Sequence, residues 1–339
     1  MNARALRVAA AFGAAVLLLS LASCPGSSCE RGGKCPAPRS PSPSSSAATR
    51  APGAALSGTW RRIPSPPGGA RQEVAAAVVG GKIYVAGGLV ANGATARVEA
   101  YDPVAREWSR VAPLPIRLHH PMAVGYHGRL YVIGGITTGL GGADSARVFM
   151  LEGDRWTEAP SMHHARGAGS AVVVGNRIVV AGGISGGREV APVELFDGKT
   201  WRDGADMPSP LDHVGAATDG RYVYVAGGRR SGSHFASFQR YDPVADAWQR
   251  LRSMPTARSG LGVAFAAGHV VVIGGEGPRI FPEVEAFDVA RGTWRRLPNM
   301  GVPRHGLGTV AIGTRVYTFV GGFRVGLAPS PVCEELVLT

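Results

Sequence analysis

Residues 82–88 read KIYVAGG, a short apolar run that ends in two glycines. Closely similar stretches recur as RLYVIGG (129–135), RIVVAGG (177–183), YVYVAGG (222–228), HVVVIGG (269–275) and VYTFVGG (316–322). A short apolar run bounded by glycine is typical of a buried strand, and paired glycines allow positive φ and close backbone approach. The pattern predicts six copies of one strand, each ending at a structural glycine pair: Gly87 and Gly88, Gly134 and Gly135, Gly182 and Gly183, Gly227 and Gly228, Gly274 and Gly275, Gly321 and Gly322.

The tryptophans repeat with the same period. All six of them stand 45 to 48 residues apart, at Trp60, Trp108, Trp156, Trp201, Trp248 and Trp294. A period in the middle forties indicates an array of similar structural units.

Two further segments complete each unit. A run of small residues precedes each glycine strand, as in AAAVV (75–79) and GVAF (262–265). Between the glycines and the next Trp lies a segment that usually ends in an aromatic residue and Asp: VEAYD (98–102), VFMLE (148–152), VELFD (193–197), FQRYD (238–242) and VEAFD (284–288). Each unit is therefore interpreted as four strands. The second unit departs from the pattern, with Leu151 and Glu152 in place of the aromatic residue and Asp.

This order of small strand, glycine-pair strand, aromatic-Asp strand and Trp strand resembles the kelch repeat. The resemblance covers residues 57–339 and implies an all-β, six-bladed propeller whose four-stranded antiparallel blades surround a central channel. The composition agrees, because 49 Gly and 25 Pro interrupt any stretch of helical periodicity. Small first strands suit the crowded axis, Trp suits packing between blades, and Asp suits the start of a turn.

The two ends of the array predict how the ring closes. The array begins with a lone Trp strand, SGTWRRIP (57–64), and finishes with three strands that lack a Trp. We expect residues 57–64 to form the outermost strand of the last blade, which would close the ring without a covalent bond.

The first 23 residues have the pattern of an export signal. Arg4 and Arg7 precede an apolar run from Val8 to Ala22, which is short for a membrane span. The sequence Leu21-Ala22-Ser23-Cys24 resembles the lipobox of bacterial lipoproteins, which implies cleavage before Cys24 and a lipid on its thiol. We expect an exported protein, lipid-anchored to the bacterial envelope, at the outer membrane on its periplasmic face or the cell surface. An ordinary cleaved signal peptide and a retained anchor are the alternatives.

Residues 24–56 form the predicted lipidated tether, because they are rich in Pro, Ser, Ala and Gly and have almost no large apolar side chains. The tether holds Cys29 and Cys35, and Cys333 lies near the C-terminus. In an oxidising compartment Cys29 could pair with Cys35 or one of them with Cys333, and the sequence leaves this open. A zinc site built on thiolates is not expected, because CxxC is absent.

The basic charge does not point to a nucleic acid. Of the formal net charge of +12, two charges belong to Arg4 and Arg7 and three to residues 25–56, which leaves +7 on residues 57–339. An arginine bias beside abundant Ala, Gly and Pro is typical of a GC-rich genome. The aromatic residues lie at core positions rather than among basic runs, so no nucleic-acid partner is expected.

The candidate ligand site lies in the loops that enter the first strands. Arg71, Arg117, Arg166, Arg258 and Arg304 stand 16 or 17 residues before the first glycine of a pair, and the same loops hold several histidines. Around a channel mouth, guanidinium and imidazole groups suit a carboxylate, sulfate or phosphate. The candidate ligand-binding residues are Arg71, Arg117, His120, Arg166, His213, Arg258, Arg304 and His305. The alternative is structural, with each Arg donating hydrogen bonds to loop carbonyls.

No motif for catalysis or metal binding is convincing. GISGG (183–187) fits G-x-S-x-G, but a strand follows it where that motif needs a helix. His119-His120 and His163-His164 are neighbours in extended chain, so the two rings of a pair point in opposite directions. Ligands from different blades could still converge. We expect no metal and no cofactor, and we identify no catalytic residue.

Two kelch enzymes provide a comparison. Copper galactose oxidase needs a Cys bonded to a Tyr, whereas Cys333 is the only Cys of residues 57–339 and has no Tyr beside it. A periplasmic sialic acid epimerase shares only blade number, export and a basic mouth, although an Arg cluster with an acid or His as base would suit that reaction.

The sequence therefore favours a monomeric binding module, tethered to the membrane by its lipid alone, that recognises a protein or glycan partner at an Arg-rich and His-rich mouth suited to anionic groups. No catalysis is evident. One alternative is an enzyme acting on an anionic sugar, such as a sialic acid epimerase or mutarotase. A second is a structural protein of the envelope.

Overall fold

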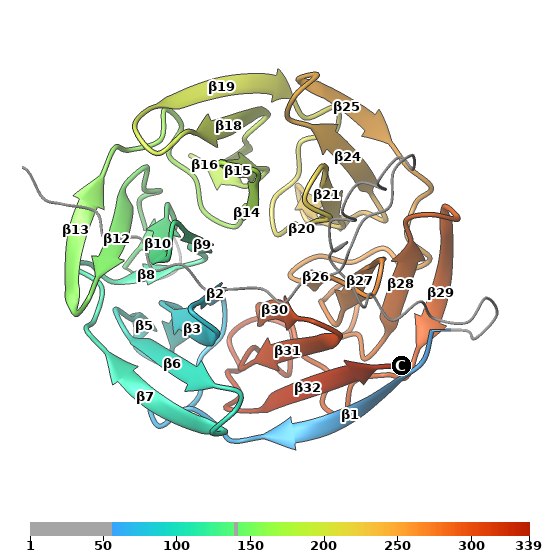
Figure 1. The fold of residues 1–339 in the computed structure, drawn as a ribbon, viewed down its shortest axis with the longest axis horizontal. Helices are drawn as coiled ribbons and strands as arrows, with labels where there is room; N and C mark the ends of the chain where they lie inside the picture. The colour runs from blue at the N-terminus through green and yellow to red at the C-terminus, as the bar shows by residue number, and fades with distance from the viewer. Residues whose placement is uncertain (1–55, 139–141) are drawn as a thin grey trace, which may run out of the picture. The chain divides into compact units, whose positions relative to one another are not determined.

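The computed structural model describes residues 56–138 and 142–339. The chain divides into two units, Met1–Pro52 and Gly53–Thr339, and every described residue belongs to the second. These residues form six four-stranded antiparallel sheets arranged as blades around a central axis (Figure 1). The predicted all-β, six-bladed propeller is confirmed. The predicted signal peptide, Cys24 and the tether up to residue 55 lie outside the described residues.

Each blade consists of four strands that follow one another from the axis outward. Blade 1 contains β2 (Ala75–Val79), β3 (Lys82–Ala86), β6 (Val98–Asp102) and β7 (Glu107–Val111), and blade 2 contains β9 (Met122–Tyr126), β10 (Arg129–Ile133), β12 (Val148–Glu152) and β13 (Arg155–Ala159). Blade 3 contains β14 (Ser170–Val174), β15 (Arg177–Ala181), β18 (Pro192–Phe196) and β19 (Trp201–Asp206), and blade 4 contains β20 (Gly215–Thr218), β21 (Val223–Ala226), β24 (Phe238–Asp242) and β25 (Ala247–Arg250). Blade 5 contains β26 (Gly262–Ala266), β27 (His269–Ile273), β28 (Val284–Asp288) and β29 (Thr293–Leu297).

Blade 6 joins the two ends of the propeller. Its inner strands are β30 (Gly308–Ile312), β31 (Arg315–Phe319) and β32 (Cys333–Leu338), and its outermost strand is β1 (Gly58–Ile63). β1 pairs antiparallel with β32 along its whole length, from Gly58 opposite Leu338 to Ile63 opposite Cys333. In Figure 1 the two strands lie side by side at the bottom of the ring. The predicted closure by residues 57–64 is therefore confirmed.

Two sets of loops share one face of the propeller, which we call the mouth face. One set enters the first strand of each blade, and the other connects its second and third strands. Isolated backbone bridges join the two sets, as between Gln72 and Leu89 or Asp212 and Arg229. Four pairs of short strands also belong to these loops: β4 (Leu89–Val90) with β5 (Gly93–Ala94), β8 (Leu118–His119) with β11 (Ile136–Thr137), β16 (Ile184–Ser185) with β17 (Arg188–Glu189), and β22 (Arg229–Arg230) with β23 (Ser233–His234).

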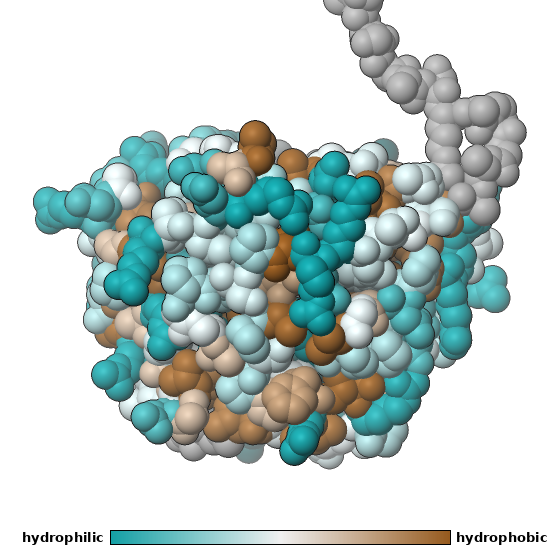
Figure 2. Space-filling view, turned by 90° about the horizontal axis from the view of Figure 1, so that it is seen from below, coloured by the Kyte–Doolittle hydropathy of each residue, from teal (hydrophilic) through white to brown (hydrophobic). Residues whose placement is uncertain are grey.

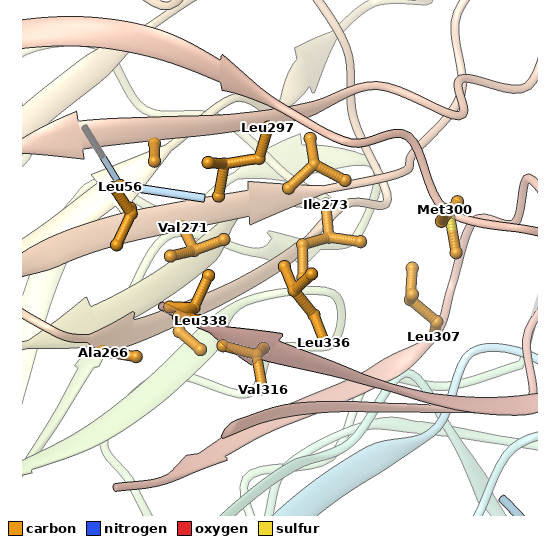
Figure 3. Close-up of a cluster of buried hydrophobic side chains, with 13 residues drawn as sticks. Leu56, Ala266, Val271, Ile273, Leu297, Met300, Leu307, Val316, Leu336 and Leu338 are labelled. Carbon is orange, nitrogen blue, oxygen red and sulfur yellow. The ribbon is translucent and has the colours of Figure 1, made fainter. Parts of the chain in front are cut away.

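The hydrophobic core lies between neighbouring blades. Figure 3 shows one such cluster, in which Val271 and Ile273 of blade 5 meet Val316, Leu336 and Leu338 of blade 6. The side chains of successive blades interdigitate there, as packed sheets require. Each blade is thus stabilised chiefly by its two neighbours, so the ring depends on being closed.

The six tryptophans add a hydrogen bond at every blade junction. Each indole Nε1 donates, over 2.7 to 3.0 Å, to a backbone carbonyl just beyond the outer strand of the preceding blade or at its end. Trp60 of β1 takes part by donating to Pro298 O, which follows blade 5. The outer strands also carry exposed charged side chains, and Figure 2, which views the propeller edge-on from the side of β1, shows hydrophilic residues over much of this rim. Such charges oppose pairing of the outer strands with other molecules.

The glycine pairs lie where predicted in five blades, and blade 6 is offset by one residue. In blade 1, Gly88 has a φ of +116°, and a Cβ there would stand 2.8 Å from Gln72 O, so only glycine fits. In blade 6, Val320 (φ 49°) and Gly321 (φ 108°) have the positive φ values of the pair, whereas Gly322 does not. The predicted pair of Gly321 and Gly322 is therefore wrong by one position, because φ rather than the letters GG defines the turn.

The described part of the chain contains one cysteine, Cys333. It is a free, buried thiol, and burial raises the pKa of the thiol to about 11. Cys29 and Cys35 lie outside the described residues. Within residues 56–138 and 142–339 there is no helix long and apolar enough to cross a membrane.

Removing residues 57–64 should lower the melting temperature strongly. The deletion exposes the edge of β32, removes Ile63 from the core and takes away the Trp60 hydrogen bond. A loss of several kcal/mol corresponds to a fall of about 10 °C or more at roughly 2–4 °C per kcal/mol. Differential scanning fluorimetry measures this shift. Deleting eight residues of the predicted tether, 41–48, is the control, and equal melting temperatures for the two deletions would contradict the closure.

Candidate functional site

Six equivalent loops meet at the axis on the mouth face. Each contributes one residue with a φ between 52° and 58°: Glu73, His120, Ala168, His213, Gly260 and Gly306. The backbone N–H of each donates to the carbonyl of its counterpart in the preceding blade, over 2.7 to 3.0 Å. The chain of six hydrogen bonds closes on itself, since Glu73 N donates to Gly306 O. We call these six residues the axial ring.

The axial ring surrounds a cavity of about 140 Å³ at the end of the central channel. Small residues of the first strands line the rest of the cavity, including Ala76, Ala123, Ala171 and Ala216. Figure 1 shows these strands gathered around the axis. Because the wall is built from small side chains, the chemical character of the cavity depends on the polar side chains of the ring.

The three predicted histidines gather around the carboxylate of Glu73. His120 Nε2 lies 3.0 Å from one carboxylate oxygen, and His305 Nδ1 lies 3.3 Å from the other. The rings of His120 and His213 meet edge to face, with centroids 4.7 Å apart. Ala168 stands between these two in the ring, and its small side chain allows the contact. The structure thus brings His120, His213 and His305 together with a glutamate that the sequence analysis did not select.

A second group of charges adjoins His213. Asp212 Oδ1 contacts His213 Nδ1, and Arg229 Nη2 donates to His213 Nε2 over 2.9 Å. The same guanidinium also donates to Asp212 (3.1 Å) and to Glu276 (3.0 Å), and Glu276 lies 3.4 Å from His305 Nδ1. These contacts connect the mouth into one polar network.

Burial and charge act in opposite directions on the carboxylates of this network. Burial raises the pKa of Glu73, but His120 and His305 outweigh it and hold that pKa well below the usual range. Burial likewise raises the pKa of Asp212, and contacts with His213 and Arg229 lower it below the ordinary value. Both groups are therefore anionic at neutral pH.

His213 and His305, which contact these carboxylates, have pKa values that are shifted in opposite directions. Burial lowers the pKa of His213, and nearby positive charge adds to this effect despite the contact with Asp212. Burial also lowers the pKa of His305, but Glu73 and Glu276 outweigh it, so this pKa is raised. At neutral pH His213 is therefore a neutral imidazole with one nitrogen lone pair.

Four of the five predicted arginines do not face the cavity. Arg71, Arg166, Arg258 and Arg304 have no exposed surface, and each pairs with a buried glutamate on the third strand of its own blade, at 2.5 to 3.0 Å. Those glutamates are Glu99, Glu194, Glu285 and Glu334. The guanidinium groups also donate to backbone carbonyls, as from Arg166 to Gly182 O at 3.0 Å. The structure places these arginines in the structural role that the sequence analysis gave as its alternative.

The other two blades replace both members of the pair together. Blade 2 has Leu118 and Phe149 at the two positions, and blade 4 has Leu211 and Gln239. The leucines are buried in the core. Where the arginine is absent the glutamate is absent too, as expected if the buried charge of each requires the other.

Arg117 is the exception among the five. It precedes Leu118, the true counterpart of the buried arginines, by one residue and is exposed. Its side chain lines a surface groove with Asn92, Ala94 and Ile116 between the loops of blades 1 and 2. The predicted equivalence of Arg117 with the other four is therefore wrong by one position.

Simple counting from the glycine strand identifies the ring residues. Glu73, His120 and His213 each stand 14 residues before the first glycine of the pair in their blade, at Gly87, Gly134 and Gly227. The arginine spacing does not give this register, so Glu73 is not among the predicted residues although the two histidines are. Asp212, Arg229 and Glu276 gave no such signal, because their roles depend on contacts between blades 4, 5 and 6.

Replacing Arg258 by Leu should destabilise the propeller by about 3–5 kcal/mol, because Glu285 would remain buried and unpaired. The double variant Arg258→Leu/Glu285→Gln copies blade 4 and should recover part of this loss. Denaturant unfolding of both variants measures the difference, with Arg117→Leu as the exposed control. A double variant no more stable than the single one would mean that the pair is not coupled.

Comparison with known proteins agrees with this architecture. The kelch motif model matches residues 70–115, 165–208, 210–255 and 257–301, more than half of the chain. Kelch-like protein terF of Aspergillus terreus is 34% identical over 126 residues, covering 34% of this chain and 28% of that protein. Kelch-like protein 34 of Homo sapiens is 30% identical over 223 residues (64% and 27%), and Kelch-like protein 15 of Danio rerio is 27% identical over 222 residues (60% and 30%). The matches span less than a third of each relative. Because the motif model covers more than half of its length, the chain belongs to the kelch-repeat family.

Proposed function

We propose that this chain is a binding module that docks a protein partner on the mouth face of its propeller. The observation that carries the proposal is the loop after β31, where Phe323, Val325 and Leu327 are 45%, 60% and 43% exposed. We call residues 323–327 the apolar loop. Three large apolar side chains within five residues form a local patch of the kind that protein partners cover.

The backbone of the apolar loop is held in place by residues at the mouth. Gln72 Nε2 donates to Gly326 O over 2.9 Å, and Ala328 N donates to Gln72 Oε1 over 2.8 Å. His305 Nε2 lies 3.0 Å from Arg324 O. A loop that is already ordered loses little conformational entropy when it binds, which favours it as a docking element.

The opposite face has no comparable group among the described residues. Val104 and Val244 are 93% and 90% exposed, but each stands alone in a turn between the third and fourth strands of a different blade. Single exposed apolar residues are ordinary on protein surfaces. The asymmetry between the faces therefore supports docking at the mouth face.

The family similarity supports a protein partner more than a glycan. The matched relatives include proteins named kelch-like and F-box/kelch-repeat, in which the similar region is one part of a longer chain. An anionic sugar, whether bound or epimerised, is suggested by a ring of guanidinium and imidazole groups at the channel mouth. Four of those arginines are paired with buried glutamates, so this support for a sugar ligand is withdrawn.

The proposal includes attachment to the membrane through a lipid on Cys24. The lipobox-like sequence before Cys24 and the low-complexity segment that follows it support this. A propeller tethered in this way would present its mouth face to partners within the bacterial envelope.

Phe323→Ser/Leu327→Ser should abolish partner capture, whereas Val104→Ser/Val244→Ser should not. Both double variants remove two exposed apolar side chains, but only the first lies on the mouth face. Full-length protein of each kind is cross-linked in envelope preparations, and the captured proteins are quantified by mass spectrometry. If both double variants lose a captured protein equally, or if neither variant loses it, docking at the apolar loop is contradicted.

Cys24→Ser should prevent lipid labelling and release the protein from the membrane fraction. The thiol is the only atom in the proposed lipobox that accepts the diacylglycerol, so serine removes the anchor without changing the propeller. Palmitate labelling and membrane fractionation measure the effect, with Cys29→Ser as the matched control. A Cys24→Ser protein that still sediments with membranes would contradict anchoring by lipid.

A further inference from the structure

The axial ring carries ligand-type side chains at three of its six positions. Glu73, His120 and His213 each offer one atom, and these atoms lie within 4.8 Å of one another. The other three positions are Ala168, Gly260 and Gly306, which leave the axis free. A Cβ on Gly306 would overlap the carboxyl group of Glu73. The ring therefore combines two imidazoles and one carboxylate with the space that they need to converge.

His213 presents a lone pair on Nε2. Arg229 can only donate, so its hydrogen bond to His213 Nε2 requires that this nitrogen be unprotonated. The proton lies on Nδ1, which contacts Asp212. An imidazole held by a carboxylate at one nitrogen, with a lone pair at the other, has the arrangement common to histidines that bind metals.

His120 has a buried nitrogen without a hydrogen bond. Its Nδ1 lies 2.5 Å from His119 Nδ1, which leaves Nε2 directed at Glu73. The His120 side chain is only 9% exposed, and Nε2 makes no hydrogen bond of acceptable geometry although Glu73 Oε2 is 3.0 Å away. A buried polar atom without a hydrogen bond is rare and calls for an explanation.

The charges around the ring favour a cation. Glu73, Asp212 and Glu276 bring three carboxylates into the network, against the guanidinium of Arg229 and the imidazole of His305. Arg229 is one-third exposed and keeps its contacts to Asp212 and Glu276 if it gives up His213 Nε2. A divalent ion could therefore replace one hydrogen bond without leaving the arginine unpaired.

We propose that Glu73, His120 and His213 bind one divalent transition-metal ion of the zinc type at the mouth of the channel. Imidazole nitrogen and carboxylate oxygen are the ligands of such ions, and three protein ligands leave a fourth position open toward the mouth. Two ligand atoms, each about 2.0–2.1 Å from a tetrahedral zinc ion, lie roughly 3.4 Å apart. The 3.0 Å between His120 Nε2 and Glu73 Oε2 is close to this separation.

This site could not be derived from paired histidines in the sequence. Its ligands come from blades 1, 2 and 4, and no two of them are neighbours in the chain. It departs from the expectation of no metal and develops the alternative that ligands from different blades converge. Metal binding here does not require the apolar loop, so the proposal is independent of protein docking.

A second cluster supplies the matched control. His163 and His164 both contact Asp203, at 2.9 and 3.3 Å, and all three side chains are substantially exposed. Glu194, the remaining member, is already paired with Arg166 and accepts the backbone N–H of His163. This cluster also combines histidine and glutamate, with Asp203 as a further carboxylate, but its glutamate is not available to a metal.

The test is a titration of the chelator-treated full-length protein with Co²⁺, followed by competition with Zn²⁺ in a calorimeter. We expect one equivalent to bind, with visible absorption bands of a nitrogen- and oxygen-ligated ion and without the charge-transfer band of a thiolate ligand. Glu73→Gln, His120→Ala and His213→Ala should each weaken binding at least 100-fold. Asp212→Asn, which acts through His213, should weaken it about tenfold. His163→Ala/His164→Ala should bind as the natural protein does.

Several outcomes would overturn the proposal. These are absence of stoichiometric binding, a thiolate band that assigns the ion to cysteines, or loss of binding in the His163→Ala/His164→Ala variant. Melting curves of the metal-free proteins establish that each variant is folded. If the alanine variants unfold, Glu73→Gln decides the question, because glutamine keeps the shape of the side chain and removes only its charge.

Discussion

The closed circle of six backbone hydrogen bonds in the axial ring is the constraint on which the mouth depends. Each bond joins one blade to the next, so the circle fixes six loops at once. Positive φ at all six positions is the condition for it. Non-glycine residues adopt such values at a cost of about 1 kcal/mol or more, and they keep them only where the surrounding structure enforces the conformation. The tryptophan hydrogen bonds at the rim complete the constraint from outside.

The entry loops combine two roles in residues that are two positions apart. In blade 1, Arg71 turns into the blade and pairs with Glu99, while Glu73 turns toward the axis. The buried pair is linked to the carbonyls around the glycine turn, and the ring residue closes the contact with the next blade. Stability and the candidate site are therefore built by the same loop. Substitutions that remove a buried arginine will disturb the mouth through the backbone, even though the guanidinium never reaches the cavity.

The fold could be predicted from sequence because its signals are local and repeated. The glycine strand, the aromatic-Asp turn and the Trp strand each indicate a local structure. Six copies of the same pattern remove the ambiguity that a single copy would leave. The direction of a side chain within a loop has no such signal. Arg71 and Glu73 lie in the same short segment, and only the backbone φ of Glu73 decides which of them reaches the axis. The offset in blade 6 has the same origin, because Val320 adopts the φ that the letters GG assign to Gly321.

The departures from the repeat are therefore more informative about function than the repeat itself. The axial ring needs only positive φ, and glycine supplies it without strain, as at Gly260 and Gly306. Glu73, His120 and His213 adopt the same φ with larger side chains and bury polar atoms. Their backbones make the same ring hydrogen bonds as the backbones of the two glycines. Their backbone strain therefore does not strengthen the hydrogen bonds that close the ring. What these residues add is a carboxylate and two imidazoles on the axis, and the proposed metal site is built from those groups.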